Sequence, residues 1–264
     1  MCRGSLCFKQ IDGKRKDLVF GARIKPSLAY QHGLWYNTVS ITFTITGETD
    51  MKIAFMGDSV TEGCFGLYPV GASFDTFREP EKVYHAKLLP MLEAKYGAGN
   101  VEIINAGLSG DNTTGGCKRL DRDVLSHHPD CVVICYGLND SNRLLERFER
   151  NLREILGRVL ASGARAVFLT PNMLNTYVDP RTLPEAAHIA RRTMEIQNGG
   201  TMDRFMDAAR VICAELGVDV CDAYAYWKKL AQEGVDTTAH LANYINHPDE
   251  EMHGVFARML APML

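Results

Sequence analysis

The chain has 264 residues, of which 46% are hydrophobic, and its formal net charge is −3 at pH 7. This length and apolar content are enough for one large domain with a sizeable core. A slightly acidic chain lacks the basic surface that is typical of proteins that bind nucleic acid or anionic membranes, so we expect neither partner. No apolar run approaches the roughly 20 residues of a membrane-spanning helix, and the first residues lack the long apolar stretch of a secretory signal.

Residues 1–50 differ from the rest of the chain. They are polar and basic at first, become β-like over residues 38–46, and pair with no predicted helix. Two interpretations stay open: these residues are an appended hairpin at the edge of a sheet, or they are non-native and the biological start is Met51. The codons of the Gly-Glu pair shortly before Met51 can match a bacterial ribosome-binding sequence. We favour the start at Met51, because the regular domain, residues 51–264, opens there with its first strand.

From Met51 onward, short apolar strands alternate with helices. We predict strands at residues 52–56, 101–105, 131–136, 166–170 and 218–221. We predict helices at residues 140–161, 201–216 and 249–260. In the first of these helices, apolar residues recur at steps of three and four and form one face: Leu144, Phe148, Leu152, Ile155 and Val159. The alternation predicts a parallel sheet that is covered by helices on both faces.

The first strand ends abruptly in Gly57-Asp58-Ser59. A hydroxyl at this point lies at the carboxyl edge of a parallel sheet, where open α/β folds keep their functional sites. The tripeptide alone is common, and either Asp58 or Ser59 is also a suitable cap for the helix that follows. The segment is therefore informative only together with segments further along the chain.

Three further segments place polar residues at a strand end or a helix start. Asn105-Ala-Gly-Leu-Ser-Gly110 closes the second strand, Tyr136-Gly-Leu-Asn-Asp140 closes the third, and Asn246-His-Pro248 precedes the last helix. Each has an ordinary alternative, as a turn glycine, a helix cap or a helix entry. In this order, the four segments resemble the SGNH branch of the GDSL esterase/lipase family, and the likeness spans residues 51–264.

The resemblance gives each segment a chemical role. Acyl transfer needs a hydroxyl nucleophile, a base that takes its proton, and donors for the tetrahedral oxyanion. The resemblance implies that Ser59 is the nucleophile, with Asp58 in support, and that His247 is the base. It implies oxyanion donors from the Ser59 N–H, the Gly107 N–H and the Asn139 side-chain amide. A glycine at position 107 fits, because a residue without Cβ lets its backbone N–H approach a substrate closely.

The sequence departs from the family at the group that orients the histidine. The family usually has an aspartate three residues before it, and here that position is Tyr244. Two interpretations stay open: a backbone carbonyl holds the imidazole of a Ser–His dyad, or another acid such as Asp249 substitutes, although Asp249 is also a suitable helix cap. Glu250 lies three residues before His253 and offers a second acid–histidine spacing. We interpret His253 as a helix-face residue, because it falls within the last helix.

Eight cysteines are scattered along the chain without a Cys-x-x-Cys pair. We interpret them as buried, reduced thiols of a cytoplasmic protein rather than as metal ligands or disulfides. The His, Asp and Glu residues show no convincing metal-ligand spacing, and acyl transfer by this route needs no metal. We therefore expect no metal and no cofactor.

Two insertions after strand ends are expected to overhang the site, where α/β enzymes place specificity. Residues 64–82 contain four aromatic residues, and residues 172–191 contain Met173, Tyr177 and two prolines. Such loops favour a compact polar ester, such as an acetylated sugar, over a long acyl chain. Packing of the loops onto the domain is the alternative explanation of the aromatic residues.

These observations together predict a three-layer α/β/α sandwich with a flavodoxin-like, five-stranded parallel sheet, which is the SGNH hydrolase fold. The expected function is a serine esterase that hydrolyses small or carbohydrate-linked acyl esters through an acyl-enzyme on Ser59. Two alternatives stay open: a ligand-binding module that has lost its full triad, and an acyltransferase that uses the same site. The expected partner is a small-molecule ester, and the sequence does not predict an oligomeric state.

Overall fold

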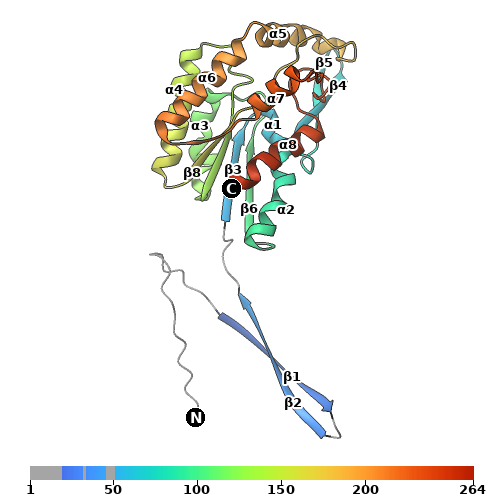
Figure 1. Ribbon diagram of the computed structural model, residues 1–264, viewed down its shortest axis with the longest axis vertical. Coiled ribbons are helices and arrows are strands. Elements are labelled where there is room, and N and C mark those ends of the chain that lie inside the picture. The colour runs from blue at the N-terminus through green and yellow to red at the C-terminus, as the bar shows by residue number, and fades with distance from the viewer. Residues whose placement is uncertain (1–19, 32–33, 46–50) are drawn as a thin grey trace. The chain divides into compact units, whose positions relative to one another are not determined.

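The computed structural model describes residues 20–31, 34–45 and 51–264, and the chain divides into two compact units, Met1–Glu48 and Thr49–Leu264. In the first unit, β1 (Phe20–Gln31) and β2 (Leu34–Ile45) form an antiparallel two-stranded sheet in which Phe20 lies opposite Ile45 (Figure 1). The Gly-Glu pair before Met51 lies outside the described residues. The origin of residues 1–50 and the boundary after residue 50 therefore stay predictions.

The second unit is built on a five-stranded sheet in the order β6-β3-β7-β8-β9, with every neighbouring pair parallel. The strands are β3 (Met51–Gly57), β6 (Val101–Gly107), β7 (Cys131–Cys135), β8 (Arg165–Leu169) and β9 (Asp219–Cys221). The register places Gly57 beside Gly107 on one side and beside Cys135 on the other. The carboxyl ends of β3, β6 and β7 are therefore level at one edge of the sheet.

Helices cover both faces of this sheet. Figure 1 shows α3, α4 and α6 on one face and α2 and α8 on the other, and the helices pack in the same groups. The helices are α1 (Ser59–Glu62), α2 (Tyr84–Tyr96), α3 (Thr113–Asp123), α4 (Leu145–Ala161), α5 (Ala187–Asn198), α6 (Thr201–Leu216), α7 (Ala223–Gln232) and α8 (Glu250–Leu260), with short 3-10 turns η1 (Leu125–His127), η2 (Pro184–Ala186) and η3 (Ala261–Met263). The predicted three-layer fold with flavodoxin-like strand order is confirmed.

The apolar runs of the sequence account for the central strands. Residues 53–56 of β3 and 131–134 of β7 are fully buried, as expected for parallel strands that are covered on both faces. The predicted helix at residues 201–216 matches α6, which buries Phe205, Ala209 and Ile212 and ends at Gly217 with φ 66°. A left-handed residue at this position suits glycine and stops the helix.

The helix predicted over residues 140–161 begins five residues later, at Leu145. Leu144 is 65% exposed, so its predicted place on the buried face is wrong. The physical reason lies at Asp140, whose carboxylate accepts hydrogen bonds from the backbone N–H and the hydroxyl of Thr113 at the start of α3 (3.1 and 2.6 Å). Asp140 therefore serves α3 and does not cap α4.

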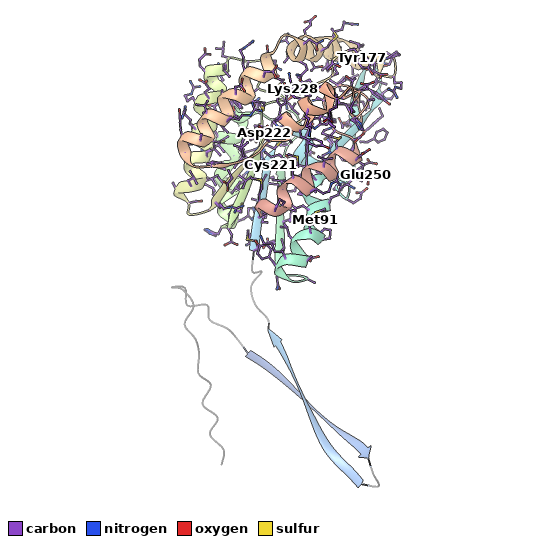
Figure 2. The ribbon with its side chains drawn as sticks, in the orientation of Figure 1. Met91, Tyr177, Cys221, Asp222, Lys228 and Glu250 are labelled. Atoms are coloured by element: carbon purple, nitrogen blue, oxygen red, sulfur yellow. The ribbon has the colours of Figure 1, made fainter. Side chains whose placement is uncertain are left out.

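The described cysteines are free thiols, five of them buried and Cys117 partly exposed. One of them, Cys221, ends β9, and Asp222 follows it as the cap of α7 (Figure 2). Burial raises the pKa of the Cys221 and Cys213 thiols to about 12, so neither is poised to react as a thiolate. Within the described part of the chain, no helix is long and apolar enough to cross a membrane.

Candidate active site

Ser59 lies where β3 passes into the short helix α1, at the carboxyl edge of the sheet. Asp58 caps this helix, because its carboxylate accepts a hydrogen bond from the Val60 N–H (3.0 Å). The capping role considered for Asp58 is therefore real, and it sets the turn that carries the serine. The side chain of Ser59 is only 4% exposed.

His247 contacts Ser59 directly. Its Nε2 lies 2.9 Å from Ser59 Oγ, and its Nδ1 lies 2.8 Å from the backbone carbonyl oxygen of Phe65. A carbonyl oxygen can only accept, so Nδ1 carries the proton and the neutral ring offers the Nε2 lone pair to the serine hydroxyl. This tautomer is the one that a general base next to a nucleophile requires.

Burial keeps the ring of His247 neutral. The residue is 5% exposed, and loss of water around the ring lowers its pKa to about 4. The hydrogen bond to Phe65 and the negative charge of Glu62 oppose this effect but are smaller. The imidazole is therefore in its proton-accepting form across the physiological range.

Asp249 does not orient His247, so that expectation is corrected. One carboxylate oxygen of Asp249 accepts from the Met252 N–H (2.9 Å) and caps α8, and the other lies 2.9 Å from His240 Nδ1. These two contacts hold the carboxylate at the start of α8 and leave it without a hydrogen bond to His247. The backbone carbonyl of Phe65, in β4 (Cys64–Val70), binds His247 Nδ1 instead, which agrees with the first of the two interpretations of the sequence.

The second acid–histidine spacing does not form a pair. Glu250 binds Lys87 Nζ (2.8 Å) on α2. His253 is fully buried in α8, where its Nδ1 accepts from the Tyr84 N–H (3.2 Å) and its ring lies against that of Phe65. The interpretation of His253 as a residue of the helix face agrees with this position.

The loop that carries His247 is held by an asparagine side chain. Asn243 Oδ1 accepts the backbone N–H groups of Ile245, Asn246 and His247 (3.0, 2.9 and 3.0 Å). The Asn172 amide donates to the Asn246 carbonyl (2.9 Å) and ties the loop to the segment after β8. Asn243 is not among the site residues predicted from the sequence, and its signal is an asparagine four residues before His247.

The two glycines of the second segment have different environments. The Gly107 N–H donates to Asn105 Oδ1 (2.9 Å), and a Cβ at Gly107 would collide with the backbone of Glu62 in α1. A glycine at position 107 is therefore required by the close packing of β6 against α1. Gly110 instead lines the cavity at Ser59, adopts φ 74°, and its N–H has no hydrogen-bond partner among the described residues. Gly110, and not Gly107, is the glycine of this segment that lines the cavity, and the donor role expected of Gly107 stays a prediction.

Asn139 lies at the same cavity, as expected from the sequence. Its Nδ2 donates to the backbone carbonyl of Asp111 (2.8 Å) and has a longer contact with Asp58 (3.4 Å). The first hydrogen bond fixes the amide plane, and the second N–H is held only weakly. Burial raises the pKa of the Asp58 carboxyl to about 7, with further contributions from the negative charges of Asp140 and Asp111. A neutral Asp58 places less negative charge beside Asn139 than an ionised one.

A cavity of about 250 Å³ opens over Ser59. It is lined by Ser59, Leu67, Phe74, Thr76, Ser109, Gly110, Asn139, Ile189, Asn243, Ile245, Asn246 and His247. Among these described lining residues there is no carboxylate, lysine or arginine, so the cavity favours an uncharged ligand. Both predicted insertions contribute to it, the first through a hairpin of β4 (Cys64–Val70) and β5 (Ser73–Arg78), the second through Ile189.

A larger hollow of about 540 Å³ lies between α2 and α8, and Figure 2 shows Met91 and Glu250 on these helices. None of the candidate catalytic side chains lines it. In the part of the chain that the structure describes, no group of three or more His, Cys, Asp or Glu side chains is arranged to hold a metal ion. The expectation that the reaction uses no cofactor stays a prediction.

Known proteins resemble this chain in sequence and in fold. The model of the GDSL-like lipase/acylhydrolase family matches residues 55–255. An acetylxylan esterase of Geobacillus stearothermophilus is 26% identical over 167 residues, which cover 58% of this chain and 75% of that protein. An arylesterase of Vibrio mimicus is 29% identical over 138 residues, which cover 50% of this chain and 62% of that protein.

Solved structures extend the likeness to the fold. A catalytic mutant of the acetylxylan esterase Axe2 from Geobacillus stearothermophilus matches with a TM-score of 0.60 at 21% identity and covers 82% of this chain and 94% of that one. LAE5, an alpha/beta hydrolase from the metagenome of Lake Arreo, matches with a TM-score of 0.60 at 22% identity, and the match covers 81% of this chain and 94% of that one. At these identities the structural likeness concerns the fold alone.

Proposed function

Since the chain belongs to the GDSL-like lipase/acylhydrolase family and is a carboxylic ester hydrolase, we propose that it is a serine esterase with Ser59 as nucleophile and His247 as base. The observation that carries this proposal is the continuous pair of hydrogen bonds from Ser59 Oγ to His247 Nε2 (2.9 Å) and from His247 Nδ1 to the Phe65 carbonyl (2.8 Å). Nucleophile, base and orienting group are thus in contact before substrate binds.

Acylation follows from this geometry. His247 Nε2 takes the proton of the Ser59 hydroxyl while Oγ attacks the ester carbonyl, and the carbonyl electrons move to oxygen to form a tetrahedral oxyanion. The Nδ1–H bond to the Phe65 carbonyl keeps the ring in place as it becomes positively charged. When the intermediate collapses, the ester C–O bond breaks and the imidazolium gives its proton to the departing alcohol.

Deacylation repeats the sequence with water. His247 takes a proton from a water molecule that attacks the acyl carbonyl on Ser59, and a second oxyanion forms. Collapse of this intermediate breaks the bond to Oγ, which recovers its proton from His247, and the free carboxylic acid leaves. The base returns to its starting tautomer, so one histidine serves both halves of the reaction.

We place three donors around the oxyanion: the backbone N–H groups of Ser59 and Gly110 and the second N–H of the Asn139 amide. Support comes from the presence of all three residues in the lining of the cavity and from the hydrogen bond between Asn139 and the Asp111 carbonyl, which fixes the amide. Donors that are fixed in advance stabilise the developing charge without reorganisation, and losing one typically lowers turnover about 10²–10³-fold.

The proposed substrate is a small, uncharged ester, such as an acetyl group on a carbohydrate. The cavity has room for a short acyl chain, and its walls combine apolar side chains (Leu67, Phe74, Ile189 and Ile245) with hydroxyl and amide groups that suit a polyhydroxy alcohol. The name of the Geobacillus stearothermophilus relative, an acetylxylan esterase, points to the same substrate class.

We also propose a cytoplasmic location, which the free, buried thiols support.

The decisive experiment measures hydrolysis of p-nitrophenyl acetate, p-nitrophenyl butyrate and acetylated xylo-oligosaccharides by the wild type and Ser59→Ala. We expect turnover in the wild type, loss of turnover in Ser59→Ala, and wild-type rates in the control Ser126→Ala, whose serine lies in the exposed turn η1. Acetate released in step with p-nitrophenol supports hydrolysis over transfer to an alcohol. Undiminished turnover in Ser59→Ala would refute the mechanism.

A further inference from the structure

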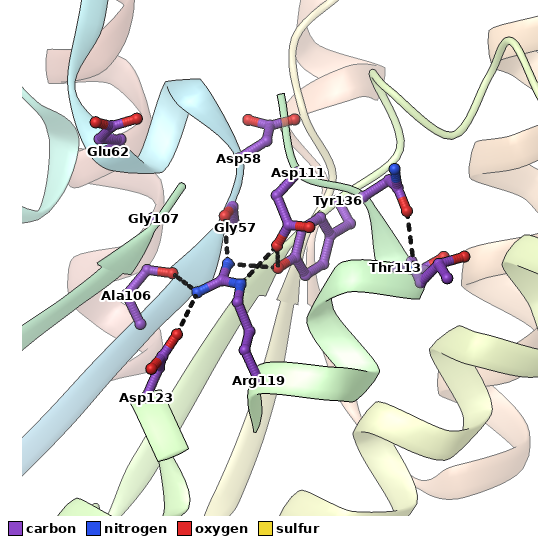
Figure 3. A network of polar contacts seen from close by, with 12 residues as sticks. Gly57, Asp58, Glu62, Ala106, Gly107, Asp111, Thr113, Arg119, Asp123 and Tyr136 are labelled. Carbon is purple, nitrogen blue, oxygen red and sulfur yellow. Dashed lines mark hydrogen bonds and ion pairs between the residues drawn. The ribbon is translucent and has the colours of Figure 1, made fainter. Parts of the chain in front are cut away.

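Arg119 lies beneath the edge of the sheet that carries the proposed oxyanion donors. It belongs to α3 and is only 6% exposed, yet it carries a full positive charge. A buried guanidinium is costly unless its N–H groups are hydrogen-bonded and its charge is balanced. Figure 3 shows how the surrounding chain meets both requirements.

Every nitrogen of the guanidinium has a partner. Nε binds the carboxylate of Asp111 (2.6 Å), which is buried and balances the charge. Nη1 donates to the Ala106 carbonyl (2.7 Å), and Nη2 donates to the Gly57 carbonyl (2.9 Å) and to the Tyr136 hydroxyl (2.7 Å). The Tyr136 hydroxyl in turn donates to Asp111 (2.7 Å) and closes the network.

The partners other than Asp111 share a position in the fold: each lies at or just after the carboxyl end of a strand that leads to a proposed donor. Gly57 ends β3 two residues before Ser59. Ala106 is the penultimate residue of β6, four residues before Gly110. Tyr136 follows β7 and stands three residues before Asn139. One guanidinium therefore connects three strand ends.

Asp111 extends the connection to the third donor. Its carboxylate is bound by Arg119, and its backbone carbonyl accepts the hydrogen bond from Asn139 Nδ2 (2.8 Å) that fixes this amide. Asp111 also directly follows Gly110. A shift of Asp111 would therefore move two of the three donors, Gly110 N–H and Asn139 Nδ2, at once.

We propose that Arg119 is a positioning residue for the oxyanion hole, and this inference rests on the serine esterase function proposed above. Its planar fork fixes the relative positions of β3, β6 and Asp111, so that the donors of Ser59, Gly110 and Asn139 converge on one point. A lysine has the charge but not the rigid, forked set of donors that reaches two carbonyls and a hydroxyl together. A displacement of about 1 Å in such a site can lower turnover roughly 10²-fold.

The test compares Arg119→Lys and Tyr136→Phe with the control Arg158→Lys. Arg158 also reaches α3, through the Cys117 carbonyl (2.7 Å), but it contacts no strand end. We expect Arg119→Lys to lower kcat about 10- to 100-fold with KM changed less than about threefold, and Tyr136→Phe to lower kcat about three- to tenfold. Arg158→Lys is expected to keep the wild-type kcat. Thermal unfolding of each variant ensures that kcat is measured on folded protein.

A double-mutant cycle with Asn139→Ala separates positioning from a loss of general stability. If Arg119 acts through the donors, adding Arg119→Lys to Asn139→Ala lowers kcat by a smaller factor than adding it to the wild type, because one of the donors that it misplaces is already gone. Equal losses of kcat in the Asn139→Ala and wild-type backgrounds would overturn the inference. A folded Arg119→Lys variant with wild-type kcat would also overturn the inference. A wild type whose turnover does not depend on Ser59 would overturn both the inference and the proposed function.

Discussion

At the scale of single residues, the site depends on a backbone carbonyl where a carboxylate is expected. The Phe65 oxygen accepts from His247 Nδ1 and sets the tautomer, but it carries only a partial negative charge. A buried imidazole without a carboxylate neighbour keeps a low pKa, because burial disfavours the charged ring and no full charge in contact offsets it. This difference has a measurable consequence for the pH dependence of the reaction.

We predict that the acid limb of kcat/KM lies well below pH 6.5. The pKa of His247 is lowered to about 4, and protonation removes the lone pair that accepts the serine proton, so activity falls only as pH falls through this value. The measurement is kcat/KM for p-nitrophenyl acetate from pH 4 to pH 8, with circular dichroism at each pH. The Asp58→Asn variant should show the same acid limb of kcat/KM, since this limb reports the protonation of His247. A midpoint at pH 6.5 or above would contradict the prediction.

Asp249 offers a second prediction, because the structure gives it a helix cap in place of a catalytic role. Replacing Asp249 by alanine removes the acceptor for the Met252 N–H and should cost about 1 kcal/mol in the free energy of unfolding. We expect kcat/KM to stay within about threefold of the wild type, since the carboxylate makes no contact with His247. Urea unfolding and ester hydrolysis are measured on the same samples. A loss of two orders of magnitude in kcat with the fold intact would restore Asp249 to the catalytic group.

At the scale of elements, the β4–β5 hairpin has two functions. Phe65 on β4 binds His247, the proposed base, through its carbonyl, and Leu67, Phe74 and Thr76 help to line the cavity. The alternation of side chains along a strand separates these residues from Tyr68 and Phe77, whose rings pack together on the other face (4.7 Å between centroids). One hairpin therefore presents Phe74 to the cavity and Phe77 to solvent.

This alternation gives a prediction with an internal control. Phe74→Ala enlarges the cavity and should raise the ratio of kcat/KM for butyrate over acetate esters at least about tenfold, which is the lower end of the effect of one methylene in an apolar pocket. Phe77→Ala removes a ring of the same size that is 53% exposed and faces away from the cavity, so the ratio should not change. The measurement is kcat/KM for p-nitrophenyl butyrate and p-nitrophenyl acetate in the wild type and in both variants. Equal ratios in both variants would show that Phe74 does not limit the acyl chain.

The strands and several site residues could be predicted because their patterns are local. The apolar run before Gly57 predicts β3 and places Ser59 at the sheet edge, and His247 and Asn139 reach the same cavity. A backbone carbonyl is one of the two orienting groups that the sequence leaves open, but its residue could not be predicted, since any residue has a backbone carbonyl and nothing in the sequence marks Phe65. Gly107 and Gly110 lie in one segment, and only their surroundings separate the glycine packed on α1 from the one at the cavity.

At the scale of the whole molecule, the sheet edge buries titratable groups whose effects on stability oppose one another. Burial lowers the pKa of His85 and His247 to about 4 and that of His253 to about 3. The native state then binds fewer protons than the unfolded state below pH 6.5, so this part of the stability is lost as pH falls toward 4. Burial raises the pKa of Asp58 to about 7 and that of Asp140 to about 6. The contribution of these two carboxyl groups to the free energy of unfolding is therefore lost as pH rises from 3.8 toward those values.

Between pH 4.5 and pH 6.5 the three histidines and the two aspartates therefore make opposite contributions to the pH dependence of the free energy of unfolding, and these partly cancel. Removing one aspartate should make the contribution of the histidines visible. In Asp58→Asn the free energy of unfolding should fall more steeply on acidification than in the wild type, by about 1.4 kcal/mol per pH unit, the effect of one proton. Asparagine keeps the oxygen that caps α1, and Asp58→Ser, which also keeps an acceptor, should give the same slope if the lost titration is the cause. Urea unfolding at pH 4.5, 5.5 and 6.5 measures the slopes. Parallel curves for variant and wild type would mean that Asp58 is ionised over this range, and that the proposed oxyanion donors work beside a full negative charge.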